Sequence, residues 1–158
     1  MKRELVRNWM TPNPIKISIE ASLTDAHDLL KEYNIRRLPV VNKRGHLVGI
    51  VTLGDIREAS PSDATSLSIW EVHYLLAKLK IREIMTLDPI TIYTTDTIAN
   101  AANVMLEHKI SGLPVVEPDG RLVGIITESD IFRLVVQAWG EANIEAEPTP
   151  EEILVNVP

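Results

Sequence analysis

The chain has 158 residues, of which 45% are hydrophobic and 24% charged, a composition typical of one compact soluble domain. Its net charge of −6 provides no excess of lysine and arginine to neutralise phosphates, which argues against a general nucleic-acid-binding protein. The lack of cysteine excludes disulfides, thiolate metal sites and cysteine nucleophiles. No apolar run is long enough to span a bilayer or to form a signal peptide, so we expect a cytoplasmic protein.

An internal duplication organises the chain. A shift of 75 positions places residues 6–56 over residues 81–131 without a gap. The sequence LVGIVTLGDI at 47–56 returns as LVGIITESDI at 122–131, and LPVV occurs at both 38–41 and 113–116. Each repeat therefore has roughly fifty residues, a length that calls for packing against its neighbour.

Both repeats predict the same elements in the same order. Alternating apolar residues at 15–19 and 90–94 indicate a strand, and Ser22 or Asp96 can cap the helix that follows. The LPVV and LVGI runs, separated by a turn with Gly45 or Gly120, indicate a hairpin. A second helix is expected to begin near Asp55 or Asp130.

A single repeat is too small to bury much of its own surface. We therefore predict an α/β (α+β) fold in which two β-α-β-β-α repeats pack sheet to sheet around a pseudo-two-fold axis. The expected divisions are a first repeat at 1–60, a linker helix at 61–80, a second repeat at 81–140 and an acidic tail at 141–158.

The linker and the tail lie outside the repeats. The linker sequence LSIWEVHYLLAKLK predicts a helix with an unusually broad apolar surface, formed by Leu67, Trp70, Tyr74, Leu75, Leu76 and Leu79. Such a helix needs more than one packing partner, and the second partner is expected to be another copy of the chain. The tail contains acidic residues and three prolines, which predicts a mobile or loosely docked segment.

Signals of catalysis are weak. The four histidines, His27, His46, His73 and His108, match no zinc-binding spacing, and no serine nucleophile motif or glycine-rich phosphate loop is present. We predict neither an enzyme nor a metal site.

The repeated T-x-x-D pattern allows two interpretations. Thr52 with Asp55, and Thr127 with Asp130, resemble capping boxes at a strand-to-helix junction, and the local pattern alone favours capping. Two repeats around a two-fold axis would also create two clefts, each with one such helix start. There the Asp could accept hydrogen bonds from a ribose diol and the helix N–H groups could hold phosphate.

The doubled pattern M-T…P-I…I…LPVV…G-x-LVGI-[VI]-T-x-x-D-I resembles a tandem pair of cystathionine-β-synthase (CBS) domains, also called a Bateman module. The resemblance covers residues 6–57 and 81–136. It implies a β-α-β-β-α unit in each repeat, commonly a disc-shaped homodimer, and adenosine-containing ligands in the clefts. Such a module is usually a sensor attached to an enzyme, channel or transporter. No effector domain follows here, so we expect a stand-alone sensor.

The resemblance also implies a set of binding residues. The ribose-binding acids would be Asp55 and Asp130, with Thr52 and Thr127 as nearby hydroxyls. The remaining candidates are Ile15, Ile35 and Ile125 against the base in one cleft, Ile90, Ile110 and Ile50 in the other, Arg36, Arg37, Ser111 and Ser129 near phosphates, and Thr11 and Thr86.

The two clefts are not expected to be equivalent. Arg36 and Arg37 precede LPVV in the first repeat, whereas Ser111 and Gly112 stand at the matching places in the second. Grouping the arginines with Asp55 predicts that a phosphorylated nucleotide prefers the Asp55 cleft.

The sequence therefore predicts an adenine-nucleotide sensor that binds AMP, ADP, ATP or S-adenosylmethionine and signals to a partner protein as a homodimer. The use of Mg²⁺ is left open. The alternative is a CBS pair that binds no nucleotide and serves as a dimerisation scaffold.

Overall fold

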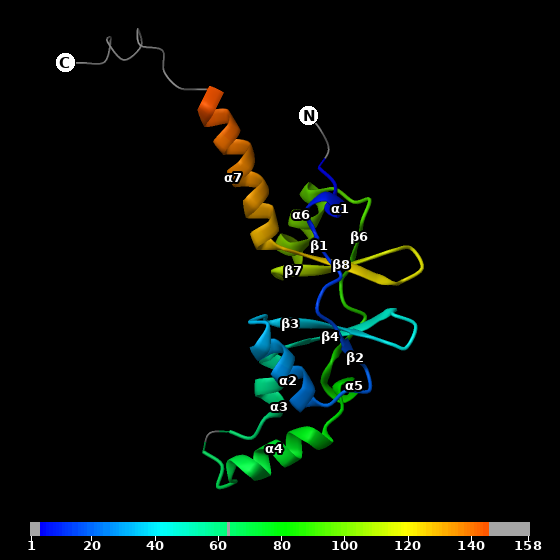
Figure 1. Ribbon diagram of the computed structural model, residues 1–158, viewed down its shortest axis with the longest axis vertical. Helices are drawn as coiled ribbons and strands as arrows, with labels where there is room; N and C mark the ends of the chain where they lie inside the picture. The colour runs from blue at the N-terminus through cyan, green and yellow to red at the C-terminus, as the bar shows by residue number, and fades with distance from the viewer. Residues whose placement is uncertain (1–3, 63, 146–158) are drawn as a thin grey trace, which may run out of the picture.

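The computed structural model describes residues 4–62 and 64–145 (Figure 1). Its elements follow in the order α1 (Val6–Trp9), β1 (Thr11–Pro12), β2 (Ile17–Ser18), α2 (Leu23–Glu32), β3 (Arg37–Val41), β4 (Leu47–Thr52), α3 (Leu53–Ala59), α4 (Ile69–Lys78), α5 (Ile81–Ile84), β5 (Thr86–Leu87), β6 (Ile92–Tyr93), α6 (Ile98–His108), β7 (Gly112–Val116), β8 (Leu122–Thr127) and α7 (Glu128–Glu145). No described helix is long and apolar enough to cross a membrane.

The predicted fold class is confirmed. Each repeat forms the expected β-α-β-β-α unit, β2-α2-β3-β4-α3 in the first and β6-α6-β7-β8-α7 in the second. Every strand of the first repeat recurs 75 residues later, and so does the left-handed residue after the first helix, Asn34 with φ 50° and Lys109 with φ 54°. The two sheets lie one above the other along the long axis of the molecule (Figure 1).

Each sheet is completed by a strand from the first residues of the other repeat. The strand orders are β2-β3-β4-β5 and β1-β8-β7-β6. Strand β1 runs antiparallel to β8 with Thr11 opposite Ile125, and β5 runs antiparallel to β4 with Thr86 opposite Ile50. Because two-residue strands carry little periodicity, the sequence analysis did not foresee this exchange.

The short helices before these strands follow the same exchange. Val6 of α1 is fully buried in the core of the second repeat, and Ile81 of α5 is fully buried in the core of the first. The LPVV strands lie at the centre of each core, where Leu38 and Leu113 are also fully buried. Neither repeat thus has a complete core without the first residues of the other.

Capping side chains begin the first long helix of each repeat, α2 and α6, with one difference from the prediction. Ser22 and Asp25 form the expected capping box at α2. At α6 the N-cap is Thr97, one residue beyond the predicted Asp96, and its hydroxyl accepts from the Asn100 N–H at 3.1 Å. The Asp96 carboxylate instead accepts from the Tyr93 N–H at 2.8 Å, so it stabilises the turn before the helix.

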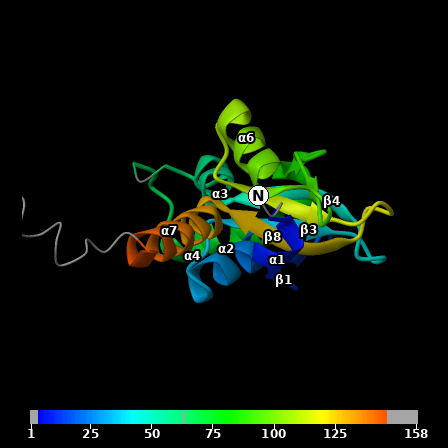
Figure 2. The ribbon, with the colours of Figure 1, turned by 90° about the horizontal axis from the view of Figure 1, so that it is seen from above.

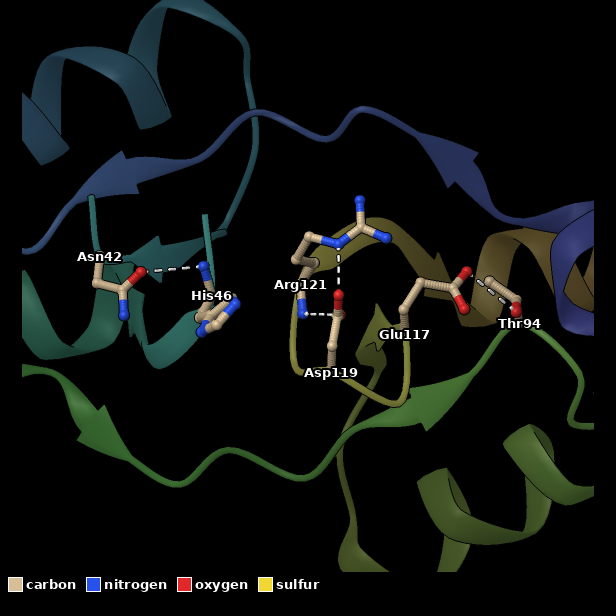
Figure 3. Close-up of polar contacts among 6 residues, drawn as sticks. All are labelled: Asn42, His46, Thr94, Glu117, Asp119 and Arg121. Atoms are coloured by element: carbon tan, nitrogen blue, oxygen red, sulfur yellow. Dashed lines mark hydrogen bonds and ion pairs between the residues drawn. The ribbon is translucent and has the colours of Figure 1, made fainter. Parts of the chain in front are cut away.

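The turns of the two hairpins pair with each other (Figure 3). The N–H of Leu47 donates to the Gly120 carbonyl at 3.1 Å, and the N–H of Leu122 donates to the Gly45 carbonyl at 3.2 Å. Beside this contact, hydrogen bonds from the backbone and side chain of Arg121 lower the pKa of Asp119 from its ordinary value. The hairpin turns therefore join the two repeats on the side of the molecule away from α4 and α7 (Figure 1).

The linker helix forms as α4, and Ser68 and Glu71 cap it with a capping box. Leu76 and Leu79 pack against the first core, whereas Trp70 is 81% exposed. The helix is thus apolar on two faces, and only one of them is covered in a single chain. The predicted tail begins as the last turns of α7, and residues 146–158 lie outside the described residues.

The exchanged strand β5 pairs with β4 beside Gly49, a position where only glycine fits. A Cβ atom at Gly49 would lie 2.6 Å from the Met85 sulfur and 2.9 Å from the Thr86 carbonyl oxygen. The methionine side chain can move, but the backbone carbonyl is held by the strand pairing. Close approach of the exchanged strand therefore requires glycine at this position.

We expect Gly49→Ala to lower the free energy of unfolding by about 1–3 kcal/mol, because the added methyl group overpacks the crossing. Urea unfolding followed by circular dichroism measures the change. Gly140→Ala is the matched control, since a Cβ there meets open space within α7 and should stabilise the chain by about 0.5–1 kcal/mol. Equal effects of the two substitutions would contradict a tight crossing.

Candidate ligand-binding cleft between the two repeats

A cleft of about 770 Å³ lies between the repeats, within the range of small-molecule sites. One wall comes from the segment before β2 and from the residues between α2 and β3. The other comes from the end of β8 and the first turns of α7. The lining residues are Thr11, Pro14, Ile15, Asn34, Ile35, Arg36, Arg37, Ser111, Ile125, Thr127, Glu128, Ser129, Asp130 and Arg133.

The apolar part of the cleft consists of Ile15, Ile35 and Ile125. The resemblance to CBS domains predicted these three residues in one cleft, and they line it together. Ile15 and Ile35 belong to the first repeat and Ile125 to the second, which the pairing of β1 with β8 holds in place. A flat apolar group could therefore lie between the two repeats.

The polar part of the cleft centres on Asp130, which is only 3% exposed. One carboxylate oxygen accepts from the Thr127 N–H at 2.9 Å and from the Thr127 hydroxyl at 3.2 Å. The other accepts from the Arg133 guanidinium at 2.7 Å. The carboxylate is thus held in one orientation at the start of α7, where the helix dipole also favours a negative charge.

Three arginines, Arg36, Arg37 and Arg133, bring positive charge to this cleft. The Arg37 guanidinium donates to the Ser111 hydroxyl, and it lies against Gly112, where a Cβ would collide with it. Burial lowers the pKa of Arg37, the nearby Arg36 lowers it further, and Glu128 opposes both. An arginine nevertheless stays charged in a protein, so the half-buried cation favours an anionic ligand.

The predicted grouping of these arginines with Asp55 is wrong. Both Arg36 and Arg37 line the cleft of Asp130. The side chain of Arg37 crosses to the second repeat and occupies the space that glycine leaves open at position 112. The expected preference of phosphorylated nucleotides for the Asp55 cleft thus loses its basis, and which cleft they prefer stays a prediction.

The other candidate cleft has a different local structure. Thr52 and Asp55 form a complete capping box, in which the Asp55 carboxylate accepts from the Thr52 N–H at 2.7 Å and the Thr52 hydroxyl accepts from the Asp55 N–H at 3.1 Å. Asp55 is half-buried, unlike Asp130. The capping interpretation is confirmed here, and a ligand-binding role of these two residues stays a prediction.

The remaining candidates of that cleft are distributed over both repeats. Thr86 pairs with Ile50 across the exchanged strand. Ile110 packs against the second core, and Ile90 is exposed. Their roles in ligand binding also stay predictions.

Four residues of the Asp130 cleft were missed by the sequence analysis: Pro14, Asn34, Glu128 and Arg133. Arg133 lies three residues after Asp130 on the same helix, a spacing that could have predicted the ion pair. No comparable sequence spacing marks Asn34. Its left-handed backbone and its position between α2 and β3 place it at the cleft, and only the structure shows this.

Solved structures of similar chains share this architecture. The CBS domain pair of protein MJ0100, solved in complex with 5′-methylthioadenosine and S-adenosyl-L-methionine, is 34% identical and has a TM-score of 0.70, with 86% of this chain and 98% of that chain covered. CBSX2 in complex with AMP is 31% identical and has a TM-score of 0.71, with 85% and 98% covered.

Sequence comparison agrees with the structural one. L-aspartate semialdehyde sulfurtransferase of Methanocaldococcus jannaschii is 35% identical over 130 residues, which are 82% of this chain but 23% of that protein. This chain thus spans about a quarter of the length of that enzyme. The sequence model of the CBS domain matches twice, at residues 6–62 and 81–137, and the chain therefore belongs to the CBS domain family as a tandem pair.

Proposed function

We propose that this chain is a regulatory module that binds an adenine nucleotide in the Asp130 cleft and transmits its occupancy to a partner protein. The observation that carries the proposal is the convergence of apolar side chains, a buried carboxylate and three arginines on one cleft. The complexes of similar CBS pairs with AMP, S-adenosylmethionine and methylthioadenosine support an adenosine-containing ligand.

Each part of such a ligand has a chemical counterpart in the cleft. The isoleucines suit the faces of an adenine ring, and the Asp130 carboxylate suits a ribose diol. The arginine guanidinium groups suit phosphate oxygens, which they bind in a planar fork. We therefore place a phosphorylated nucleotide, AMP, ADP or ATP, ahead of S-adenosylmethionine, because the sulfonium cation would meet three arginines.

The signal would travel along α7. Glu128, Ser129, Asp130 and Arg133 in its first turns line the cleft, and the helix then extends away from the two sheets (Figure 1). Phe132, Val136 and Trp139 form an exposed apolar stripe further along the helix. A ligand that binds both the first repeat and the start of α7 favours one orientation of this helix, and so one position of the stripe.

We also propose that the module functions as a homodimer. Helices α4 and α7, which carry exposed apolar residues, lie on the side of the molecule opposite the hairpin turns, toward the two ends of its long axis (Figures 1 and 2). Trp70 is 81% exposed and Trp139 is 70% exposed, which is unusual for such large apolar side chains. A second copy would cover both faces. The cytoplasmic location stays a prediction.

The sensor is first tested by a thermal-shift screen with AMP, ADP, ATP, S-adenosylmethionine, NAD and cyclic dinucleotides. A nucleotide that binds only the folded chain should add about 2.7 kcal/mol of stability at a hundredfold excess over its Kd. The phosphorylated adenine nucleotides should give the largest shifts. A flat response to the whole panel would favour the alternative function, a dimerisation scaffold without a ligand.

Arg37→Gln tests the assignment of the phosphate to the Asp130 cleft. One hydrogen bond to a charged group contributes about 1.5–3 kcal/mol, so the affinity for AMP should fall about tenfold or more. Adenosine has no phosphate and should bind with nearly unchanged affinity. Isothermal titration calorimetry of both ligands gives the comparison.

Arg82→Gln is the matched control for this substitution. Arg82 is an exposed cation outside the cleft that pairs with Glu20 at 3.7 Å, so its loss should leave both affinities unchanged. An equal loss of AMP and adenosine binding in Arg37→Gln would mean that the arginine supports the shape of the cleft and does not contact the phosphate.

Sedimentation velocity at micromolar concentration tests the dimer and should give twice the 17.7 kDa mass of the chain. Trp70→Glu should weaken the dimer about tenfold or more, because a carboxylate would be buried in an apolar contact. Tyr93→Glu is the control, since Tyr93 is also exposed but lies on β6, away from α4 and α7. A monomeric wild-type chain would refute the dimer.

A further inference from the structure

A second cavity of about 930 Å³ lies at the first repeat, between α2, α3 and α4. Of the residues predicted to bind a ligand, only Ile35 and Arg36 line this cavity, and both also line the Asp130 cleft. Its apolar lining consists of Leu30, Ile35, Leu53, Ile56, Ile69, Val72 and Leu76. The linker helix α4 therefore covers an interior space as well as the first core.

The walls of this cavity are basic. Lys31, Arg36 and Arg57 line it together with His27 and His73, and none of the described lining residues is acidic. Within the described part of the chain, no carboxylate lies within ion-pair distance of the three cations, although Asp28 lies 3.7 Å from His27. In a chain of net charge −6, this concentration of unpaired positive charge is unexpected.

Hydroxyl groups add further hydrogen-bonding capacity. Thr24, Ser60 and Ser62 line the same cavity. The Thr24 hydroxyl is buried and has no hydrogen-bond partner among the described residues, whereas the Ser60 hydroxyl donates to the Ile56 carbonyl at 2.6 Å.

We propose that this cavity binds a small organic anion, a carboxylate, sulfonate or phosphate ester with an apolar body. The apolar part of the ligand would contact the apolar lining residues, and the anionic group would contact Lys31, Arg57 and Arg36. The volume of the cavity matches that of a small-molecule site, and this combination of an apolar lining with a few convergent charged groups is typical of one. The site shares Asn34, Ile35 and Arg36 with the nucleotide cleft, its other lining residues are its own, and it does not depend on the proposed nucleotide.

Anilinonaphthalene sulfonate is a suitable probe, because it joins an apolar aromatic body to one negative charge and fluoresces when it leaves water. We expect saturable binding with one probe per chain. N-phenylnaphthylamine has the same aromatic body without the charge, and it should bind at least several-fold more weakly. The anionic group, and not the apolar body alone, would then account for recognition.

Variants on the cavity locate the site. Lys31→Gln and Arg57→Gln should each weaken the sulfonate probe about tenfold, since each removes a hydrogen bond to a charged group. They should leave the neutral analogue unaffected. Val72→Trp should block both probes, because it fills the space under α4. Circular dichroism and thermal unfolding show that each variant is folded.

The nucleotide-cleft variant Arg37→Gln and the surface variant Arg82→Gln should retain the probe, because neither residue lines this cavity. Loss of binding in Arg37→Gln with retention in Arg57→Gln would overturn the proposal and place the anion in the Asp130 cleft. Absence of saturable binding would also overturn it. So would an affinity that falls as the chain dimerises, since a second copy would then fill the cavity.

Discussion

The exchange of the two short strands is the constraint on which the rest of the structure depends. Strand β1 completes the sheet of the second repeat and β5 completes that of the first, while Val6 and Ile81 fill the opposite cores. Each repeat of roughly fifty residues buries too little surface to be stable alone, and the exchange makes two weak units one cooperative domain. It also brings Thr11 beside Ile125, so the cleft forms only when both repeats are folded.

The near-symmetry of the repeats makes their differences informative. Position 112 is glycine where the first repeat has Arg37, and the missing side chain opens the space into which Arg37 reaches. The arginine of one repeat thereby serves the cleft of the other. The two acids of the T-x-x-D pattern differ as well. Asp55 completes a capping box, whereas Asp130 is buried and paired with Arg133. The two copies of the T-x-x-D pattern therefore have different electrostatic environments, and only Asp130 lies in the cleft that Arg36, Arg37 and Arg133 line.

The position of the Asp130 cleft suits a sensor because its walls belong to different repeats, so a bound ligand would contact both. Residues between α2 and β3 form one wall, and the first turns of α7 form the other. Asn34, Ile35 and Arg36 also line the cavity beneath α4, so one short segment lies between two spaces of different chemistry. A nucleotide in the Asp130 cleft and an anion in the cavity beneath α4 would both contact Arg36, and each would then change the affinity of the other by the same factor. Helix α4 borders the cavity and α7 borders the cleft, and both helices also carry exposed apolar residues.

The sequence by itself determined the duplication, the order of elements in each repeat, the capping residues Ser22 and Thr52, and the linker helix, because period, caps and turns are encoded by residues close together in the chain. It also determined the isoleucines that meet in the cleft, through the resemblance to CBS domains. Only the tertiary structure decided where the two-residue strands pair, since any open sheet edge offers them the same hydrogen bonds. It likewise decided which cleft receives Arg37, because the direction of a long flexible side chain depends on the space its distant neighbours leave, here above Gly112.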